Sequence, residues 1–116
     1  ELIYKEKVVA LFGGLDTPVS MAIVPLVNQE KVPFMGPWAA GTPVTKNGAK
    51  PNFAFRVSAG DEIVSVAMIE YSSKTFGVKK PGLMLVNNPW GESNEKGLAV
   101  AMKDKGVTAA STWCRN

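Results

Sequence analysis

The stretch Lys7-Val-Val-Ala-Leu-Phe-Gly-Gly-Leu-Asp-Thr-Pro18 decides the fold class. Its apolar run over residues 7–12 is typical of a strand buried on both faces of a parallel sheet. Two glycines then allow a tight turn. Asp16 or Thr17 can accept hydrogen bonds from the first turn of a helix, in which Pro18 needs no N–H partner. The stretch therefore predicts a strand, a turn and a helix in succession.

The same order of elements recurs along the chain. Further strands are predicted at residues 32–35, 53–57, 82–87 and 107–112, with a long irregular stretch over residues 36–52. Strands that alternate with helices indicate an α/β fold with a mainly parallel sheet flanked by helices. We expect this fold class for the whole chain.

Three helices are predicted from apolar periodicity and from start and stop signals. The first is expected to kink at Pro25 without breaking. The second is expected to start in a capping box over residues 58–61 and to stop at Gly77, and the third to run from about Glu92 to Lys105 before Gly106. The inward stripes are Val19, Ala22, Ile23, Leu26 and Val27 in the first, Ile63, Val66, Ala67 and Tyr71 in the second, and Leu98, Ala101 and Met102 in the third.

Composition excludes several classes of function. The chain has 116 residues, 46% of them apolar and 20% charged, which predicts one compact domain. It has no histidine and only one cysteine, Cys114, so Ser-His-Asp and Cys-His catalysis, zinc fingers and internal disulfides are excluded within it. The net charge of +3 comes mainly from scattered lysines, a pattern that does not favour nucleic-acid binding. No cofactor motif is found, and we expect no cofactor, no metal and no enzymatic activity.

Three loops follow predicted parallel strands and are candidates for ligand binding. They span residues 13–17, 36–42 and 87–91, and they should converge at the carboxyl edge of the sheet. Free N–H groups at helix N-termini there would suit a carboxylate or another anion. A structural explanation stays open for each loop: the first is also a tight turn with its cap, and Trp38 and Trp90 could simply cover the sheet edge.

These loops resemble those of periplasmic substrate-binding proteins of the branched-chain amino acid type, the extracytoplasmic receptors of ABC importers. The resemblance rests on residues 8–18, on the helix-to-strand passage over residues 22–34 and on Leu85-Val-Asn-Asn-Pro-Trp-Gly91. It implies a bacterial, periplasmic receptor with two lobes, a membrane permease as partner, and binding without chemistry. It further implies that residues 1–106 belong to the N-terminal lobe and that residues 107–116 lead toward the second lobe.

The resemblance also implies a set of ligand-binding residues. The two loops of the first half would grip the α-carboxylate of the solute, and an aromatic side chain would pack on it; the expected residues are Leu15, Asp16, Thr17, Trp38, Ala39, Ala40, Gly41, Thr42 and Trp90. Thr17 and Thr42 are the hydroxyl candidates. Asp16 would repel a carboxylate unless it caps the helix. Trp38 would favour a flat aromatic solute, so both an amino acid and an aromatic or aliphatic carboxylate stay open.

Two expectations complete this hypothesis. The alternative class is a small α/β enzyme or a response-regulator-like signalling domain, which shares the order of layers; a signalling domain would need acidic residues clustered at strand ends, where only Asp16 is so placed. The chain alone is expected to bind its solute poorly and to associate with copies of itself, because an incomplete sheet leaves an open edge and exposed apolar residues.

Overall fold

The structure, a computed structural model, describes residues 1–115 and divides into two compact units. The first unit is Glu1–Ser58 and the second begins at Ala59. Each unit carries its own parallel sheet, three strands in the first and two in the second. The α/β fold class with parallel sheets flanked by helices is confirmed.

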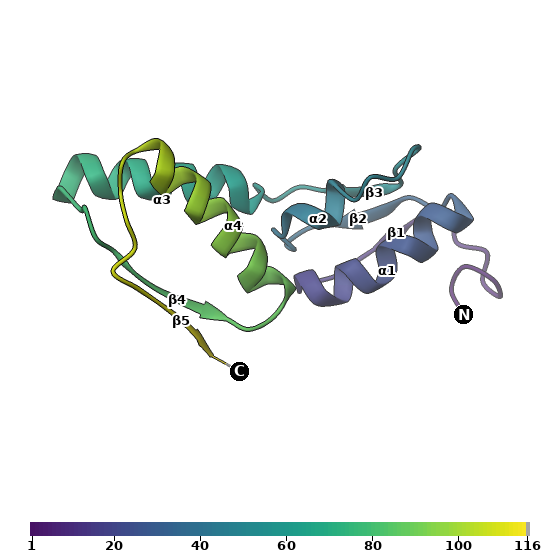
Figure 1. Cartoon of the computed structure of the whole chain (residues 1–116). Helices are drawn as coiled ribbons and strands as arrows, with labels where there is room; N and C mark the ends of the chain where they lie inside the picture. The colour runs from purple at the N-terminus through teal and green to yellow at the C-terminus, as the bar shows by residue number, and fades with distance from the viewer. Residues whose placement is uncertain (116) are drawn as a thin grey trace. The chain divides into compact units, whose positions relative to one another are not determined.

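The first unit is built on strands β1 (Leu11–Phe12), β2 (Phe34–Gly36) and β3 (Ala54–Arg56), in that order in the sheet. All three run parallel. Helix α1 (Thr17–Glu30) forms the crossover from β1 to β2 and contacts β2 and β3, as Figure 1 shows. The short helix α2 (Thr42–Thr45) contacts α1 and β3. It interrupts the stretch 36–52 that was predicted to be irregular, because Pro43 fits the first turn of a helix.

The core of the first unit centres on Phe34, which is 1% exposed. Helix α1 continues through Pro25, as predicted, but Val27 is the one residue of the predicted stripe that it buries fully. The buried ones are Thr17, Ser20, Val24 and Val27, whereas Val19 and Leu26 are exposed. The physical reason is that the helix is rotated so that small polar side chains pack closely beside the strand-to-helix turn. A prediction from the periodicity of apolar residues does not include these polar residues.

The second unit contains α3 (Asp61–Phe76), β4 (Gly82–Val86), α4 (Pro89–Asp104) and β5 (Ser111–Arg115). Strand β4 pairs in parallel with β5, from Gly82 opposite Ser111 to Val86 opposite Arg115. Helix α4 contacts both β4 and α3 (Figure 1). The last strand therefore starts four residues later than predicted, because Val107 joins the core as part of the connection.

The inward stripe predicted for α4 is confirmed, since Leu98, Ala101 and Met102 are buried. The stripe predicted for α3 is wrong: Ile63 and Tyr71 are 68% and 64% exposed. Helix α3 instead buries Asp61, Ser65 and Ile69. Gly97 of α4 explains this choice, because a Cβ there would lie 2.7 Å from Ser65 Oγ, so only small side chains fit where the two helices meet.

The predicted start and stop signals of the helices were correct at some helix ends and wrong at others. Gly77 ends α3 in the left-handed conformation with φ 62°, as predicted. The capping box is wrong, since Gly60 is the N-cap of α3 and no side chain caps it; the hydroxyl of Ser58 donates to the carbonyl of Ala39 instead. Helix α4 starts at Pro89, three residues before the predicted Glu92.

The pairing of the strands also corrects a larger expectation. Strand β4 does not share a sheet with β1 and β2, so the three candidate loops do not follow strands of one sheet. The cause is backbone pairing: the hydrogen-bonding partner of β4 is β5, which lies later in the chain.

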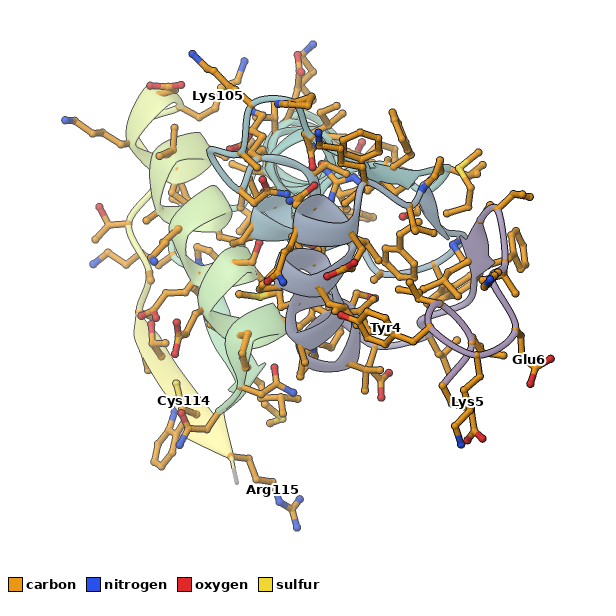
Figure 2. All side chains as sticks on the ribbon, turned by 90° about the vertical axis from the view of Figure 1, so that its right-hand side faces the viewer. Tyr4, Lys5, Glu6, Lys105, Cys114 and Arg115 are labelled. Carbon is orange, nitrogen blue, oxygen red and sulfur yellow. The ribbon has the colours of Figure 1, made fainter. Side chains whose placement is uncertain are left out.

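Two exposed hydrogen bonds to glutamate side chains shift the pKa values of surface groups. The hydroxyl of Tyr4 donates to Glu30 Oε1 at 2.9 Å, and this bond raises the pKa of Tyr4 above its ordinary value. Figure 2 labels Tyr4 in the N-terminal segment that this bond ties to α1. In the second unit, Lys74 bonds Glu70 at 2.7 Å and lowers the pKa of that carboxyl group. No helix within residues 1–115 is long and apolar enough to cross a membrane.

Candidate functional site

The turn between β1 and α1 leaves backbone donors open. Gly13 and Gly14 have φ values of 155° and 80°, which other residues rarely adopt, and they allow the chain to reverse into the helix. Asp16 is the N-cap of α1, but its side chain makes no capping hydrogen bond. Within the described residues, no acceptor takes the N–H groups of Leu15, Asp16 or Val19. These donors lie at the positive end of the α1 dipole, where an anion is stabilised.

The loop after β2 lies directly against this turn. Gly41 N donates to Thr17 Oγ1 at 3.1 Å, so the two candidate loops of the first unit are brought together as the sequence predicts. The approach is so close that a Cβ on Gly41 would collide with the methyl and hydroxyl groups of Thr17. Thr17 is 2% exposed, and its oxygen accepts a bond from the neighbouring loop. Its first role is therefore to join the loops.

Side chains from β3 and its end hold the carbonyl groups of the same loop. Arg56 Nη1 donates to the carbonyl oxygens of Ala40 and Gly41, each at 2.8 Å. Ser58 Oγ donates to the carbonyl of Ala39 at 3.5 Å. Within the described residues, the N–H groups of Ala39 and Ala40 have no acceptor. The carbonyls of the loop are thus occupied while two of its donors are open.

Two large apolar side chains border these open donors in sequence, and both are exposed. Leu15 and Trp38 each have 69% of their surface accessible. An exposed tryptophan offers a flat apolar face that can contact an aromatic or aliphatic group. Backbone donors together with exposed apolar side chains are suited to a small organic anion, whose charge and carbon skeleton need different partners.

The third candidate loop belongs to the second unit and is built differently. The side chain of Asn88 accepts hydrogen bonds from Trp90 N and Gly91 N, both at 3.0 Å. It therefore occupies donors of the first turn of α4 with an internal cap. Trp90 lies in that turn with 44% of its surface exposed, so its indole, and not the backbone around it, is the available group.

The sequence did not identify Arg56 as part of the site. Its signal was a lone arginine at the end of the apolar strand Phe53-Ala-Phe-Arg-Val57, in a chain whose other cationic residues are lysines except for Arg115. Arginine carries several donors in a fixed planar arrangement, so one side chain can hold two adjacent carbonyls. That property distinguishes Arg56 from the surface lysines.

Comparison with known proteins identifies relatives of the chain. Residues 1–112 match a family described as "Periplasmic binding protein". No curated protein sequence matches the chain. Among solved structures, an extracellular ligand-binding receptor from Rhodopseudomonas palustris HaA2 is 30% identical with a TM-score of 0.87, and the match covers 98% of this chain and 31% of that one.

Two further solved structures are of proteins whose solute is named. A leucine-binding protein from Thermotoga maritima is 26% identical with a TM-score of 0.87, covering 98% of this chain and 32% of that one. A solute-binding protein of an ABC transporter from R. palustris, in complex with 4-hydroxybenzoate, is 27% identical with a TM-score of 0.85, covering 99% of this chain and 30% of that one. The chain spans about a third of the length of each of these proteins.

Proposed function

The chain belongs to the periplasmic binding protein family, and we propose that it forms part of an extracytoplasmic bacterial receptor that binds a small carboxylate solute and delivers it to the permease of an ABC importer. The role in this proposal is binding without chemistry. The solute class is an amino acid or an aromatic or aliphatic carboxylate.

One observation carries the proposal: the backbone donors left open in the first unit. The N–H groups of Leu15, Asp16, Ala39 and Ala40 have no acceptor in the described part of the chain, although they belong to two loops tied together by the Gly41–Thr17 hydrogen bond. Unpaired N–H groups are costly once they are removed from water, so a carboxylate that accepts from them would be held strongly. The exposed Leu15 and Trp38 side chains supply contact for its carbon skeleton.

The site residues in this proposal are those of the two loops of the first unit, and the exposed indole of Trp90 is tested separately. Thr17 acts mainly by joining the loops, and Thr42 begins α2. Asp16 makes no capping bond, so its negative charge opposes an anion and would favour a solute that also carries an amino group. This consideration supports an amino acid, whereas the exposed face of Trp38 supports an aromatic acid.

The assignment to lobes is also a proposal. Residues 1–58 form a compact unit with their own sheet, which supports placing them in the N-terminal lobe. The assignment of residues 1–106 to that lobe remains a proposal, and the separate sheet of the unit that begins at Ala59 supports a boundary near Ser58 as the alternative.

Calorimetric titration of the full-length protein tests the function. L-Leucine and 4-hydroxybenzoate are titrated separately, with leucinamide and 4-hydroxybenzamide as uncharged-carboxyl controls. We expect saturable binding of at least one of the two acids and weaker binding of its amide. Equal binding of acid and amide would contradict a carboxylate site, and turnover of a solute would support the small α/β enzyme instead.

A further inference from the structure

Arg56 combines a permanent positive charge with hydrogen bonds to a candidate ligand loop of the first unit. Its two hydrogen-bond acceptors are the carbonyls of Ala40 and Gly41, and no carboxylate pairs with it in the part of the chain that the structure describes. We propose that Arg56 is a positioning residue that aims the donors of this loop at the solute carboxylate and supplies the positive charge that makes the site select anions. The proposal rests on the function proposed above.

The first part of the proposal, the orientation of the loop donors, rests on the geometry of the peptide bond. A trans peptide unit is planar, and its C=O and N–H groups point in opposite directions. When Arg56 holds the carbonyl of Ala40, the N–H of the same unit, which belongs to Gly41, must point away from the guanidinium. The structure shows this N–H donating to Thr17 Oγ1 at 3.1 Å. Arg56 therefore fixes the orientation of a peptide unit that joins the two loops.

The neighbouring peptide unit follows the same rule. Ser58 Oγ holds the carbonyl of Ala39, so the N–H of Ala40 points away from β3. This N–H has no acceptor within the described residues. Two side chains from one segment, Arg56 and Ser58, thus fix the carbonyls of three consecutive residues and direct the open donors to the other side of the loop.

The second part of the proposal, the selection of anions, rests on the charge of Arg56. Lys5, Lys74 and Lys105 pair with glutamates at the surface, whereas Arg56 is partly buried and bonds only to neutral carbonyls. A partly buried charge without a counterion has lost part of its hydration, and an anion placed nearby restores favourable interaction. The solute carboxylate, held by the donors on the other side of the same loop, would be that anion.

The test measures binding by the full-length protein and by three variants. Arg56→Gln removes the charge, Arg56→Lys keeps it without the planar donor arrangement, and Arg115→Gln is the charge-matched control. Figure 2 shows the Arg115 side chain projecting from the C-terminal end of β5, and its side chain has no hydrogen bond or ion pair within the described residues. The probes are L-leucine, 4-hydroxybenzoate and their amides.

We expect Arg56→Gln to weaken binding of the acid by about tenfold to a hundredfold, the range for a lost charged hydrogen-bonding group, and to weaken binding of its amide less. Arg56→Lys should recover part of the affinity, and Arg115→Gln should bind like the unmodified protein. Thermal unfolding of each variant identifies loss of folding. Unchanged affinity in folded Arg56→Gln, or an equal loss for acid and amide, would overturn the proposal.

Amide hydrogen exchange in the ligand-free protein separates this proposal from the proposed function. Loss of the Arg56 bonds should release the peptide unit of Ala40 and Gly41, and exchange at Gly41 N should accelerate in Arg56→Gln and less in Arg56→Lys. If the unmodified protein binds none of the four probes, the proposed function fails. The exchange rate at Gly41 then decides alone whether Arg56 holds the loop, and an unchanged rate overturns the assignment.

Discussion

The turns that lead from β1 into α1 and from β4 into α4 share a plan but differ in where their donors go. Each has a polar N-cap residue followed within two positions by proline, Asp16 before Pro18 in the first and Asn88 before Pro89 in the second. Asn88 fills two donors of its helix with its own side chain, whereas Asp16 fills none. The first turn is left open toward an external acceptor, and the second is completed internally.

This difference shows why an N-terminal turn alone does not identify an anion site. Free N–H groups occur at the start of every helix, and they are available to a ligand only where no side chain takes them. In the first unit a second element adds to the opening, because Arg56 and Ser58 tie up the carbonyls of the adjacent loop. Three experiments can break or sharpen the comparison.

The largest effect is expected from Gly41→Ala. The new methyl group would collide with Thr17 and separate the two loops of the first unit. We expect losses of about 1–3 kcal/mol in the free energy of unfolding, the usual cost of overpacking, together with weaker solute binding. Calorimetry and denaturant unfolding measure the two. Gly82→Ala is the matched control, since its nearest contact would be Ser111 Oγ at 3.7 Å; equal effects of both changes would show that the close approach is not important.

Trp90→Ala tests whether the second turn takes part in binding through its side chain. Its backbone donors are occupied by Asn88, so any contribution must come from the indole. We expect the affinity of the full-length protein for its carboxylate solute to fall by about 1–3 kcal/mol, the order for removing a large aromatic contact. Fluorescence titration or calorimetry measures it. Unchanged affinity would restrict the second turn to a structural role and widen the contrast between the two turns.

The smallest effect is expected when the two N-cap side chains are removed and their contributions to stability are compared. Asn88→Ala should lower the free energy of unfolding by about 1 kcal/mol, because two donors of α4 lose their acceptor. Asp16→Ala should change it little, because that side chain caps nothing. It should also strengthen binding of an anionic solute by removing a negative charge near the site. A cost for Asp16→Ala equal to that for Asn88→Ala, measured by urea unfolding, would show that the first turn is capped after all.

Prediction succeeded where a single residue has a strong local preference. Gly77 ends α3 because glycine adopts a positive φ without strain, and Leu98, Ala101 and Met102 of α4 face inward as their spacing indicates. It failed for the buried face of α3, where Asp61 and Ser65 replace the apolar stripe. Their burial depends on Gly97 of a different helix, which no periodicity within α3 reveals.

The candidate site was also predicted correctly in part and wrongly in part. Glycine-rich loops after predicted strands led to the residues that the structure joins through Gly41 and Thr17. Arg56 was missed because its importance depends on which carbonyls lie within its reach. Trp90 was expected at the edge of the same sheet, but β4 pairs with β5 in a sheet of its own.

The sequence by itself determined the order of strands and helices, the α/β class and the position of the open turns, because these follow from local propensity and from the spacing of apolar, glycine and proline residues. Only the tertiary structure decided which strands share a sheet, which helix faces are buried and which backbone donors stay open. These properties depend on partners distant in the chain: β5 for β4, Gly97 for Ser65, and Arg56 for the carbonyls of Ala40 and Gly41.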